Sequence, residues 1–299
     1  MSVRTMRRGA TFLAVTVVSV LGVGACGSST GPPQVRTRSI PTGATDVVIR
    51  VDTRGGFTPV EYQLSIVPEL TIYGDGRVIV TGPVTEQYPP RALPNLLTGR
   101  LDRAAVVALI DRARTDRLLE TVDFGEPQIT DNPTTTVTVN DGSEHVQRVY
   151  ALGVESEPHE LDDPTSPAAL RAALGLTDAQ TQSRRRLQDF VTAAENSASR
   201  VATEPYASSE VAIYVRPTDP VAADDPVEAG HAAWPLGDLT SFGSSDADTD
   251  NRCGVLTGAD AATALAAAAR ATNITRWESG GSTFSIVWRP LLPDEHTCP

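Results

Sequence analysis

A β-hairpin around an Asp-Gly turn is the feature that most restricts how this chain can fold. Residues 69–73 and 77–81 are rich in apolar and β-branched side chains on either side of Gly74-Asp75-Gly76. Aspartate and glycine at a turn favour a hairpin because both tolerate the positive φ angles of a tight reversal. A second hairpin follows the same pattern, with strands at 134–139 and 145–152 and a turn at Asn140-Asp141-Gly142. Both patterns predict antiparallel sheet.

Helical periodicity is clearest in residues 102–120. Their apolar side chains fall on one face at the spacing of an α-helix: Val106, Val107, Leu109, Ile110 and Ala113. Asp102 is the expected N-cap, because its carboxylate can accept the free amides of the first turn. Ser166-Pro167, Thr177 and an alanine-rich segment predict further helices at 166–175, 177–196 and 258–272.

The order of these elements predicts the fold class. Further strands are expected at 46–52, 210–216 and 282–289. Hairpins with interspersed helices indicate an α+β fold, in which helices pack on one face of an antiparallel sheet. We expect an N-terminal region at 46–152 and a C-terminal region at 153–299, either as two domains or as one. The second region contains a long irregular loop at 217–251, a length that is unusual without a function behind it.

The N-terminus has the three parts of a signal peptide. Arg4, Arg7 and Arg8 precede an apolar run at 11–21, and small residues lead to Cys26. The run is about half of the ~20 residues that a transmembrane helix needs, so residues 1–25 are expected to be removed after export. The polar residues at 26–45 cannot form a core and are expected to act as a flexible tether.

The end of this segment, Val23-Gly24-Ala25-Cys26, resembles the lipobox of bacterial lipoproteins. The resemblance implies cleavage before Cys26, diacylglycerol on its sulfur, and a location on the outer face of the cytoplasmic membrane. Two or more acyl chains hold a protein stably at a bilayer. A plain secretory peptide with an incidental cysteine is the alternative. All 25 basic residues are arginine, which is typical of GC-rich, actinobacterial genomes.

Two further cysteines, Cys253 and Cys298, are expected to form a disulfide. Thiols outside the membrane meet oxidising conditions, and two cysteines allow only one pairing. Metal binding by the two residues is the alternative.

Residues 59–76 resemble a family of uncharacterised bacterial secreted domains. The shared feature is a strand that carries proline and tyrosine, followed by an Asp-Gly hairpin. The resemblance lies in the first third of the mature chain and implies no activity.

The charge of the chain argues against nucleic-acid binding. The net charge is −12, and it is about −15 without the arginine-bearing residues 1–25. Binding to nucleic acid needs clustered positive charge to displace counterions from phosphates. The one basic cluster, Arg184-Arg185-Arg186, lies in an expected helix and is interpreted as a solvated face. An acidic domain is also repelled by anionic lipid headgroups.

Asp246, Asp248 and Asp250 are the best metal candidates. Carboxylates at alternate positions can converge on calcium, but the sixth position is Asn251 rather than glycine and the twelfth is Thr257 rather than glutamate. A solvated acidic loop is therefore the default, with calcium as the alternative. His159 and the acids beside it form a weaker metal candidate in a proline-flanked linker.

Other motifs fail in their context. Residues 27–31 fit the G-x-S-x-G nucleophile pattern, and residues 22–27 fit a dinucleotide-binding pattern. The first lies in the expected tether and the second spans the expected cleavage site, so neither can form the strand-turn-helix that its chemistry needs. Trp234, Trp277 and Trp288 could form a carbohydrate or peptide surface, although the strand alternation around Trp288 favours a core position.

These observations assign no catalytic residues and no cofactor. We expect a non-enzymatic envelope protein that binds another envelope protein, a peptide or a glycan. A hydrolase acting on cell-wall material is one alternative. An accessory subunit of a membrane transporter or sensor, docking through the 217–251 loop, is another.

Overall fold

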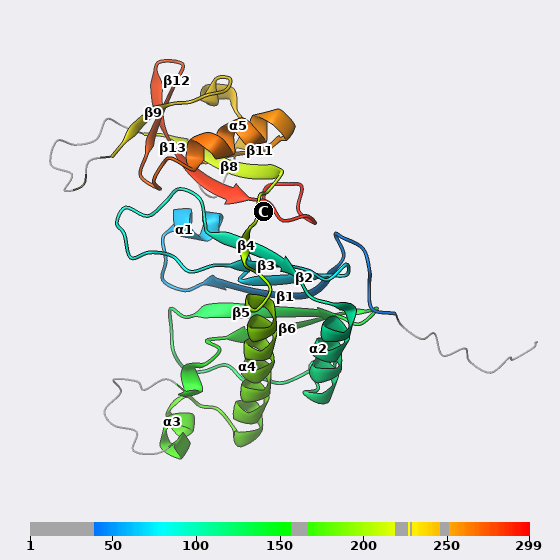
Figure 1. The fold of residues 1–299 in the computed structure, drawn as a ribbon. Coiled ribbons are helices and arrows are strands. Elements are labelled where there is room, and N and C mark those ends of the chain that lie inside the picture. The colour runs from blue at the N-terminus through cyan, green and yellow to red at the C-terminus, as the bar shows by residue number, and fades with distance from the viewer. Residues whose placement is uncertain (1–38, 157–166, 219–226, 228, 246–250) are drawn as a thin grey trace, which may run out of the picture. The chain divides into compact units, whose positions relative to one another are not determined.

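A computed structural model of the chain describes residues 39–156, 167–218, 227, 229–245 and 251–299 (Figure 1). Its strands form two sheets. Sheet 1 has seven strands in the order β6-β5-β1-β2-β3-β4-β7, and sheet 2 has six in the order β10-β11-β8-β13-β12-β9. The strands of sheet 1 are β1 (Val47–Gly55), β2 (Leu70–Tyr73), β3 (Arg77–Thr81), β4 (Leu96–Arg100), β5 (Pro133–Asn140), β6 (Glu144–Tyr150) and β7 (Glu204–Pro205). Those of sheet 2 are β8 (Glu210–Pro217), β9 (His231–Ala233), β10 (Ser244–Ser245), β11 (Arg252–Thr257), β12 (Arg276–Ser279) and β13 (Ser282–Pro290).

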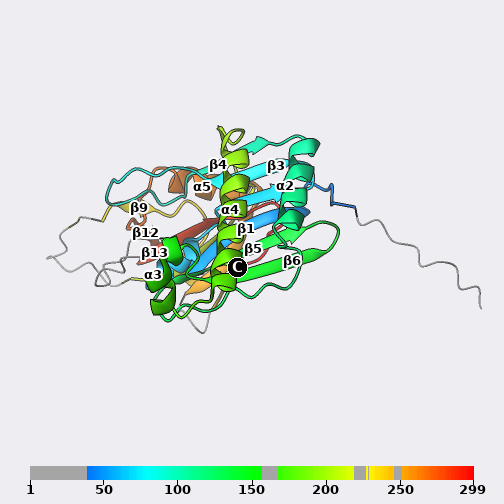
Figure 2. The same ribbon diagram turned by 90° about the horizontal axis from the view of Figure 1, so that it is seen from below.

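Five α-helices accompany the sheets in the described residues: α1 (Val60–Ser65), α2 (Arg103–Thr115), α3 (Pro167–Ala173), α4 (Asp178–Ser199) and α5 (Gly258–Ala268). Two 3₁₀ turns, η1 (Val154–Ser156) and η2 (Leu239–Ser241), complete the list. α2 and α4 lie side by side on one face of sheet 1 (Figures 1 and 2). Their apolar sides and the facing strand residues make one core, which includes Ile49, Ile110 and Phe190.

The predicted α+β class, with antiparallel sheet and helices on one face, is confirmed. The two predicted hairpins are β2–β3 and β5–β6, and all pairings of sheet 1 are antiparallel. The strands are divided between two sheets, and sheet 2 contains one parallel pairing, between β9 and β12. α5 packs on sheet 2, where Ala261, Ala264 and Ala268 join the core of that sheet.

The predicted helix starts are confirmed by their side chains. Asp102 accepts a hydrogen bond from the Ala105 N–H at 2.7 Å. Thr177 and Gln180 form a reciprocal capping box at the start of α4. Both caps stabilise a helix by supplying partners for amides that the first turn leaves free.

Two helices end earlier than predicted. α2 stops at Thr115 because Arg117 adopts a left-handed conformation (φ 61°), and the Leu118 N–H returns to the Ala113 carbonyl at 2.9 Å. Glycine usually occupies that position, so the arginine gave no stop signal. α5 ends at Ala268 rather than 272, where the Arg270 and Ala271 N–H groups bond to the carbonyls three residues before them. The Ala271 carbonyl then accepts the Ala92 N–H from a loop distant in sequence.

Several strands gave no clear pattern in the sequence. β4 contains Gly99, where a Cβ atom would lie 1.9 Å from the Val201 carbonyl oxygen. Glycine weakens the strand pattern, yet only glycine fits this close backbone approach. β11 and β12 were also not predicted. The 217–251 stretch is not wholly irregular, because β9, η2 and β10 fall within it.

The expected strand near Pro59 is wrong. Residues 60–65 form the short helix α1, in which the Tyr62 and Gln63 N–H groups bond to the Pro59 carbonyl at 3.1 and 3.2 Å. Proline suits this position because its fixed φ matches the start of a helix and its missing N–H costs nothing there. The hairpin part of the 59–76 pattern is present, and its strand part is absent.

The second face of sheet 1 contacts residues from the end of the chain. Tyr73 and Ile79 of sheet 1 share a small core with Leu292. On sheet 2, Tyr214 shares another with Leu64 of α1 and with Leu291. Leu292 therefore packs on sheet 1, and Leu64 of α1 and Leu291 pack on sheet 2.

Candidate functional site

Most of the predicted site residues fall outside the described residues. These are Cys26, the expected lipidation site, and the candidate calcium ligands Asp246, Asp248 and Asp250, as well as His159 and its acidic neighbours. In the described part of the chain, no group of three His, Cys, Asp or Glu side chains could hold a metal ion. No helix in that part is long and apolar enough to cross a bilayer.

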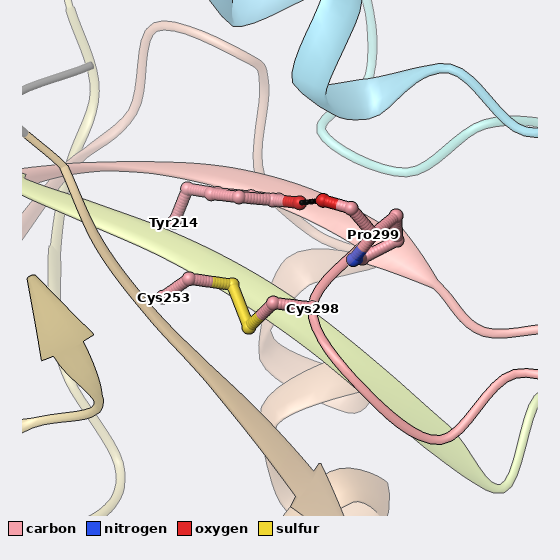
Figure 3. The surroundings of a disulfide bond; sticks show 4 residues. All are labelled: Tyr214, Cys253, Cys298 and Pro299. Carbon is pink, nitrogen blue, oxygen red and sulfur yellow. Dashed lines mark hydrogen bonds between the residues drawn. A yellow bond between two sulfur atoms is a disulfide. The ribbon is translucent and has the colours of Figure 1, made fainter. Parts of the chain in front are cut away.

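The predicted disulfide is confirmed. Cys253 of β11 and Cys298 are bonded, with their Cα atoms 6.3 Å apart. The Tyr214 hydroxyl donates to the Pro299 carbonyl beside it, at 3.1 Å (Figure 3). The bridge and this hydrogen bond fasten the last residues of the chain to sheet 2.

The three tryptophans form a buried cluster and not a binding surface. Trp234, Trp277 and Trp288 have ring centroids 5.5–6.0 Å apart. All three belong to the core of sheet 2. The core expectation for Trp288 is confirmed. The carbohydrate or peptide surface is wrong, because the hairpin β12–β13 turns Trp277 and Trp288 inward to the same core.

The interpretation of Arg184 as part of a solvated helix face is also wrong. Its side chain is 0 % exposed and pairs with the buried Glu155 at 2.9 Å. The guanidinium also donates to three carbonyls, those of Phe124, Tyr150 and Ala151. Arg185 points to solvent, as expected. Position 184 shares the inward face of α4 with Leu187 and Val191. Its charged partner, Glu155, begins the acidic segment that was interpreted as a linker.

A charged cluster lies against the second face of sheet 1. Arg50 of β1 donates to both oxygens of Asp294, at 2.7 and 2.9 Å, and the Tyr73 hydroxyl donates to the same carboxylate at 2.7 Å. Burial and the Asp294 carboxylate raise the pKa of Tyr73. The tyrosine therefore stays protonated and acts as a hydrogen-bond donor.

A second ion pair secures the same end of the chain. Arg289 of β13 donates to both oxygens of Glu295, at 2.7 and 2.9 Å, and its Nε donates to the Ile66 carbonyl. Burial alone would raise the pKa of Glu295, but Arg289 and the Leu292 N–H hold it below its ordinary value. Both pairs hold the residues after β13 in place, and neither leaves a charged group free for chemistry.

Glu69 is a partly buried carboxylate whose pKa is raised. Burial, reinforced by the charge of Asp52, raises the pKa of Glu69 from 4.5 to about 6. The Thr53 N–H donates to it at 3.0 Å. The β1–β2 register places positions 52 and 69 next to each other on the same face. Two neighbouring carboxylates, one with a raised pKa, are typical of catalytic sites that use general acid–base chemistry. Neither Asp52 nor Glu69, however, lines the cavities described below.

Glu69 should make the protein less stable as the pH rises. Its pKa is higher in the folded state, so the folded chain holds this proton between about pH 4.5 and 6 while the unfolded chain loses it. Glu69→Gln should therefore raise the free energy of unfolding by about 1–2 kcal/mol at pH 7.5 and leave it nearly unchanged at pH 4. Urea unfolding at the two pH values measures this. Glu86→Gln, on an exposed side chain, is the control, and an equal effect of Glu69→Gln at both pH values would contradict the assignment.

Among the cavities on the described surface are one beside β6 and one beside α5. The larger, about 380 Å³, lies between β6 and the segment after α2, and Glu120 is its one acid. The smaller, about 200 Å³, lies between β4, Tyr206 and α5, and its lining has no carboxylate or histidine. Neither cavity brings together paired acids or a serine with a histidine and an acid. Paired acids serve the hydrolysis of glycosidic bonds, and the serine set serves acyl transfer.

Exposed large apolar side chains gather in two short segments. Phe57, Val60 and Tyr62 lie on or just before α1, with Phe57 90 % exposed. Val84 and Tyr88 lie in the loop between β3 and β4. The remaining one, Val146, is on β6. Sequence reasoning missed the first segment, although a phenylalanine after Gly55-Gly56 in a turn was a usable signal.

The segment 57–62, which we call the α1 tip, is held from several sides. Gln63 accepts from the Gly55 N–H and donates to the Gly55 carbonyl, at 3.0 and 2.9 Å, closing the base of the segment. Leu64 is anchored among buried residues of sheet 2. Glu61 pairs with Arg216 of β8 at 2.8 Å. These contacts present the apolar side chains from a fixed backbone.

No protein-family model matches the sequence, and comparisons with curated proteins and with solved structures likewise gave no match.

Proposed function

We propose that the chain is a lipid-anchored protein of the outer face of the cytoplasmic membrane that binds another envelope protein and carries out no reaction. Lipid on Cys26 supplies the anchor, and the polar residues after it supply the tether. The tether expected at 26–45 extends too far, because Ile40 packs against the core of sheet 1. The α1 tip supplies the binding surface. The anchor follows from the lipobox pattern at residues 23–26.

The observation that carries the binding proposal is the exposure of Phe57 on a held backbone. Water is ordered around an exposed aromatic ring at a cost in free energy, which a partner removes by covering the ring. Aromatic side chains dominate the energetics of protein interfaces. Because Gln63, Leu64 and Glu61 already fix the segment, binding does not lose the entropy of ordering it.

A protein partner fits the surface better than a glycan or a substrate. The tryptophans, which could have stacked on a sugar, are buried in the core of sheet 2. The buried charged groups are engaged in ion pairs that hold segments together, as with Arg184–Glu155 and Arg289–Glu295. The proposal therefore favours a partner with an apolar groove that accepts Phe57 and Tyr62.

The test replaces the exposed side chains and measures partner capture in cells. Phe57→Ser with Tyr62→Ser should reduce the amount of partner crosslinked in membranes by at least about tenfold, the effect of losing one interface hot spot. The melting temperature should stay the same, because both side chains are exposed. Quantitative mass spectrometry of the crosslinked complex gives the readout.

A matched variant controls for surface hydrophobicity. Val84→Ser with Tyr88→Ser removes comparable exposed apolar area from another loop and should leave capture intact. Equal capture by all three proteins would refute the α1 tip as the surface. The anchor is tested separately by Cys26→Ala, which should move the protein out of the membrane fraction. Retention of that variant with the leader still cut in the same place would refute lipidation.

A further inference from the structure

The outer edge of sheet 1 is an unpaired strand. β6 is the first strand in the order of sheet 1, so only one of its sides contacts β5. The Ala151 N–H bonds to the Pro133 carbonyl, which fixes the pairing pattern: odd-numbered residues of β6 exchange hydrogen bonds with β5. The N–H and C=O groups of Glu144, Val146 and Arg148 therefore point away from the sheet. Among the described residues, the backbone groups of Val146 and Arg148 have no hydrogen-bonding partner.

The side chains of the same three residues share one exposed face. Along β6, Gln147 and Val149 are buried toward the helices, while Glu144, Val146 and Arg148 are exposed. Val146 is 41 % exposed, a high value for an apolar residue in a strand. The order along the edge is thus acid, apolar residue, base, at alternate positions.

We propose that β6 pairs with β6 of a second copy of this chain, antiparallel and about a two-fold axis at Val146. In this register Val146 lies opposite Val146 of the other copy, and Glu144 lies opposite Arg148 in both directions. Each of these opposed pairs exchanges two N–H···O=C bonds, since their backbone groups already point outward. The seven-stranded sheets of the two copies then continue into each other.

Charge selects this register over its neighbours. Only the even-numbered residues of β6 point their backbone N–H and C=O groups outward, so they must face even-numbered residues of the other copy. The register can therefore shift only in steps that keep this parity. A shift that centres the axis on Gln147 places Arg148 opposite Val146 and leaves Glu144 opposite Tyr150. A shift that centres it on Arg148 places two arginines opposite each other, which is unfavourable. Only the Val146-centred register pairs every charge with its opposite.

The larger cavity opens beside β6. It is lined by residues 145–148 and by residues 119–122. Gln147 donates to the Leu118 and Glu120 carbonyls at 2.7 and 2.8 Å, which holds the segment after α2 on the helix side. The exposed face with Glu144, Val146 and Arg148 lies on the other side.

A charge exchange tests the register. The full-length protein is extracted in mild detergent and its association followed by analytical ultracentrifugation. Glu144→Arg alone and Arg148→Glu alone should each weaken the dimer by about tenfold, because both symmetry-related pairs become repulsive. The double variant carrying both changes should restore wild-type association. Both side chains are exposed, so the melting temperatures of the three variants should match that of the wild type.

A single introduced thiol tests the axis in membranes. Val146→Cys should give a covalent dimer on mild oxidation, because an opposed hydrogen-bonded pair has Cα atoms about 5.5 Å apart, within the range of a disulfide. Glu144→Cys should not, because its own symmetry mate lies about 13 Å away along the strands. A monomer at all concentrations, failure of the double charge variant to regain association, or crosslinking of the Val146→Cys variant to a different protein or peptide would each overturn the proposal.

Discussion

Replacing Arg184 with methionine should lower the free energy of unfolding by about 3–5 kcal/mol, a magnitude typical of breaking a buried ion pair from one side. The Glu155 carboxylate is almost wholly buried and would lose its counter-charge. The carbonyls of Phe124, Tyr150 and Ala151 would lose a common donor as well. Methionine fills much of the space that arginine occupies, so the loss would reflect charge and hydrogen bonding more than a cavity.

The measurement is urea unfolding followed by far-UV circular dichroism, with tryptophan fluorescence as a second probe that reports on sheet 2. Arg185→Met is the matched control, because the neighbouring side chain is exposed, and it should change stability by less than about 0.5 kcal/mol. Glu155→Gln combined with Arg184→Met should be less destabilised than the sum of the single changes, since neither charge remains. Equal stability of the Arg184→Met and Arg185→Met proteins would show that the ion pair is not buried as described.

Removal of the disulfide should cost up to about 4 kcal/mol. Cys253 and Cys298 are separated by 45 residues, and the figure is the loop-closure entropy that a bridge of this span takes from the unfolded chain. Cys253→Ser with Cys298→Ser should therefore unfold at lower urea concentration than the wild type. Reducing agent should bring the wild type to the same midpoint and leave the double variant unchanged.

The structure also predicts where the loss of the bridge is felt. The Arg289–Glu295 pair and the Leu292 N–H hydrogen bond to Glu295 lie before Cys298 and do not depend on it. Hydrogen exchange should accordingly rise in residues 296–298 of the double variant and stay slow at Leu292. Faster exchange throughout residues 291–299 would mean that the bridge, and not the ion pair, holds this segment.

The sequence determined the local elements whose signals lie within a few residues. The Asp-Gly turns fixed the β2–β3 and β5–β6 hairpins, and Asp102 and Thr177 fixed the starts of α2 and α4, because turn and cap energies depend on adjacent backbone. The α+β class followed from their order. The pairing of Cys253 with Cys298 followed from counting, because only these two cysteines remain if Cys26 carries lipid as expected.

Other features depended on residues far apart in the chain, and only the tertiary structure decided them. Glycine is needed at position 99 of β4 because the strand passes close to the backbone of Val201. Arg184 can be buried because Glu155 and three carbonyls from other segments pair with its guanidinium. The tryptophans are core residues because β12 and β13 turn them inward beside Trp234. Local patterns cannot encode such encounters, since their free energy comes from burial and pairing that arise only when distant segments pack. The exposed α1 tip and the open edge of β6 belong to the same class, because exposure is a property of the packed chain.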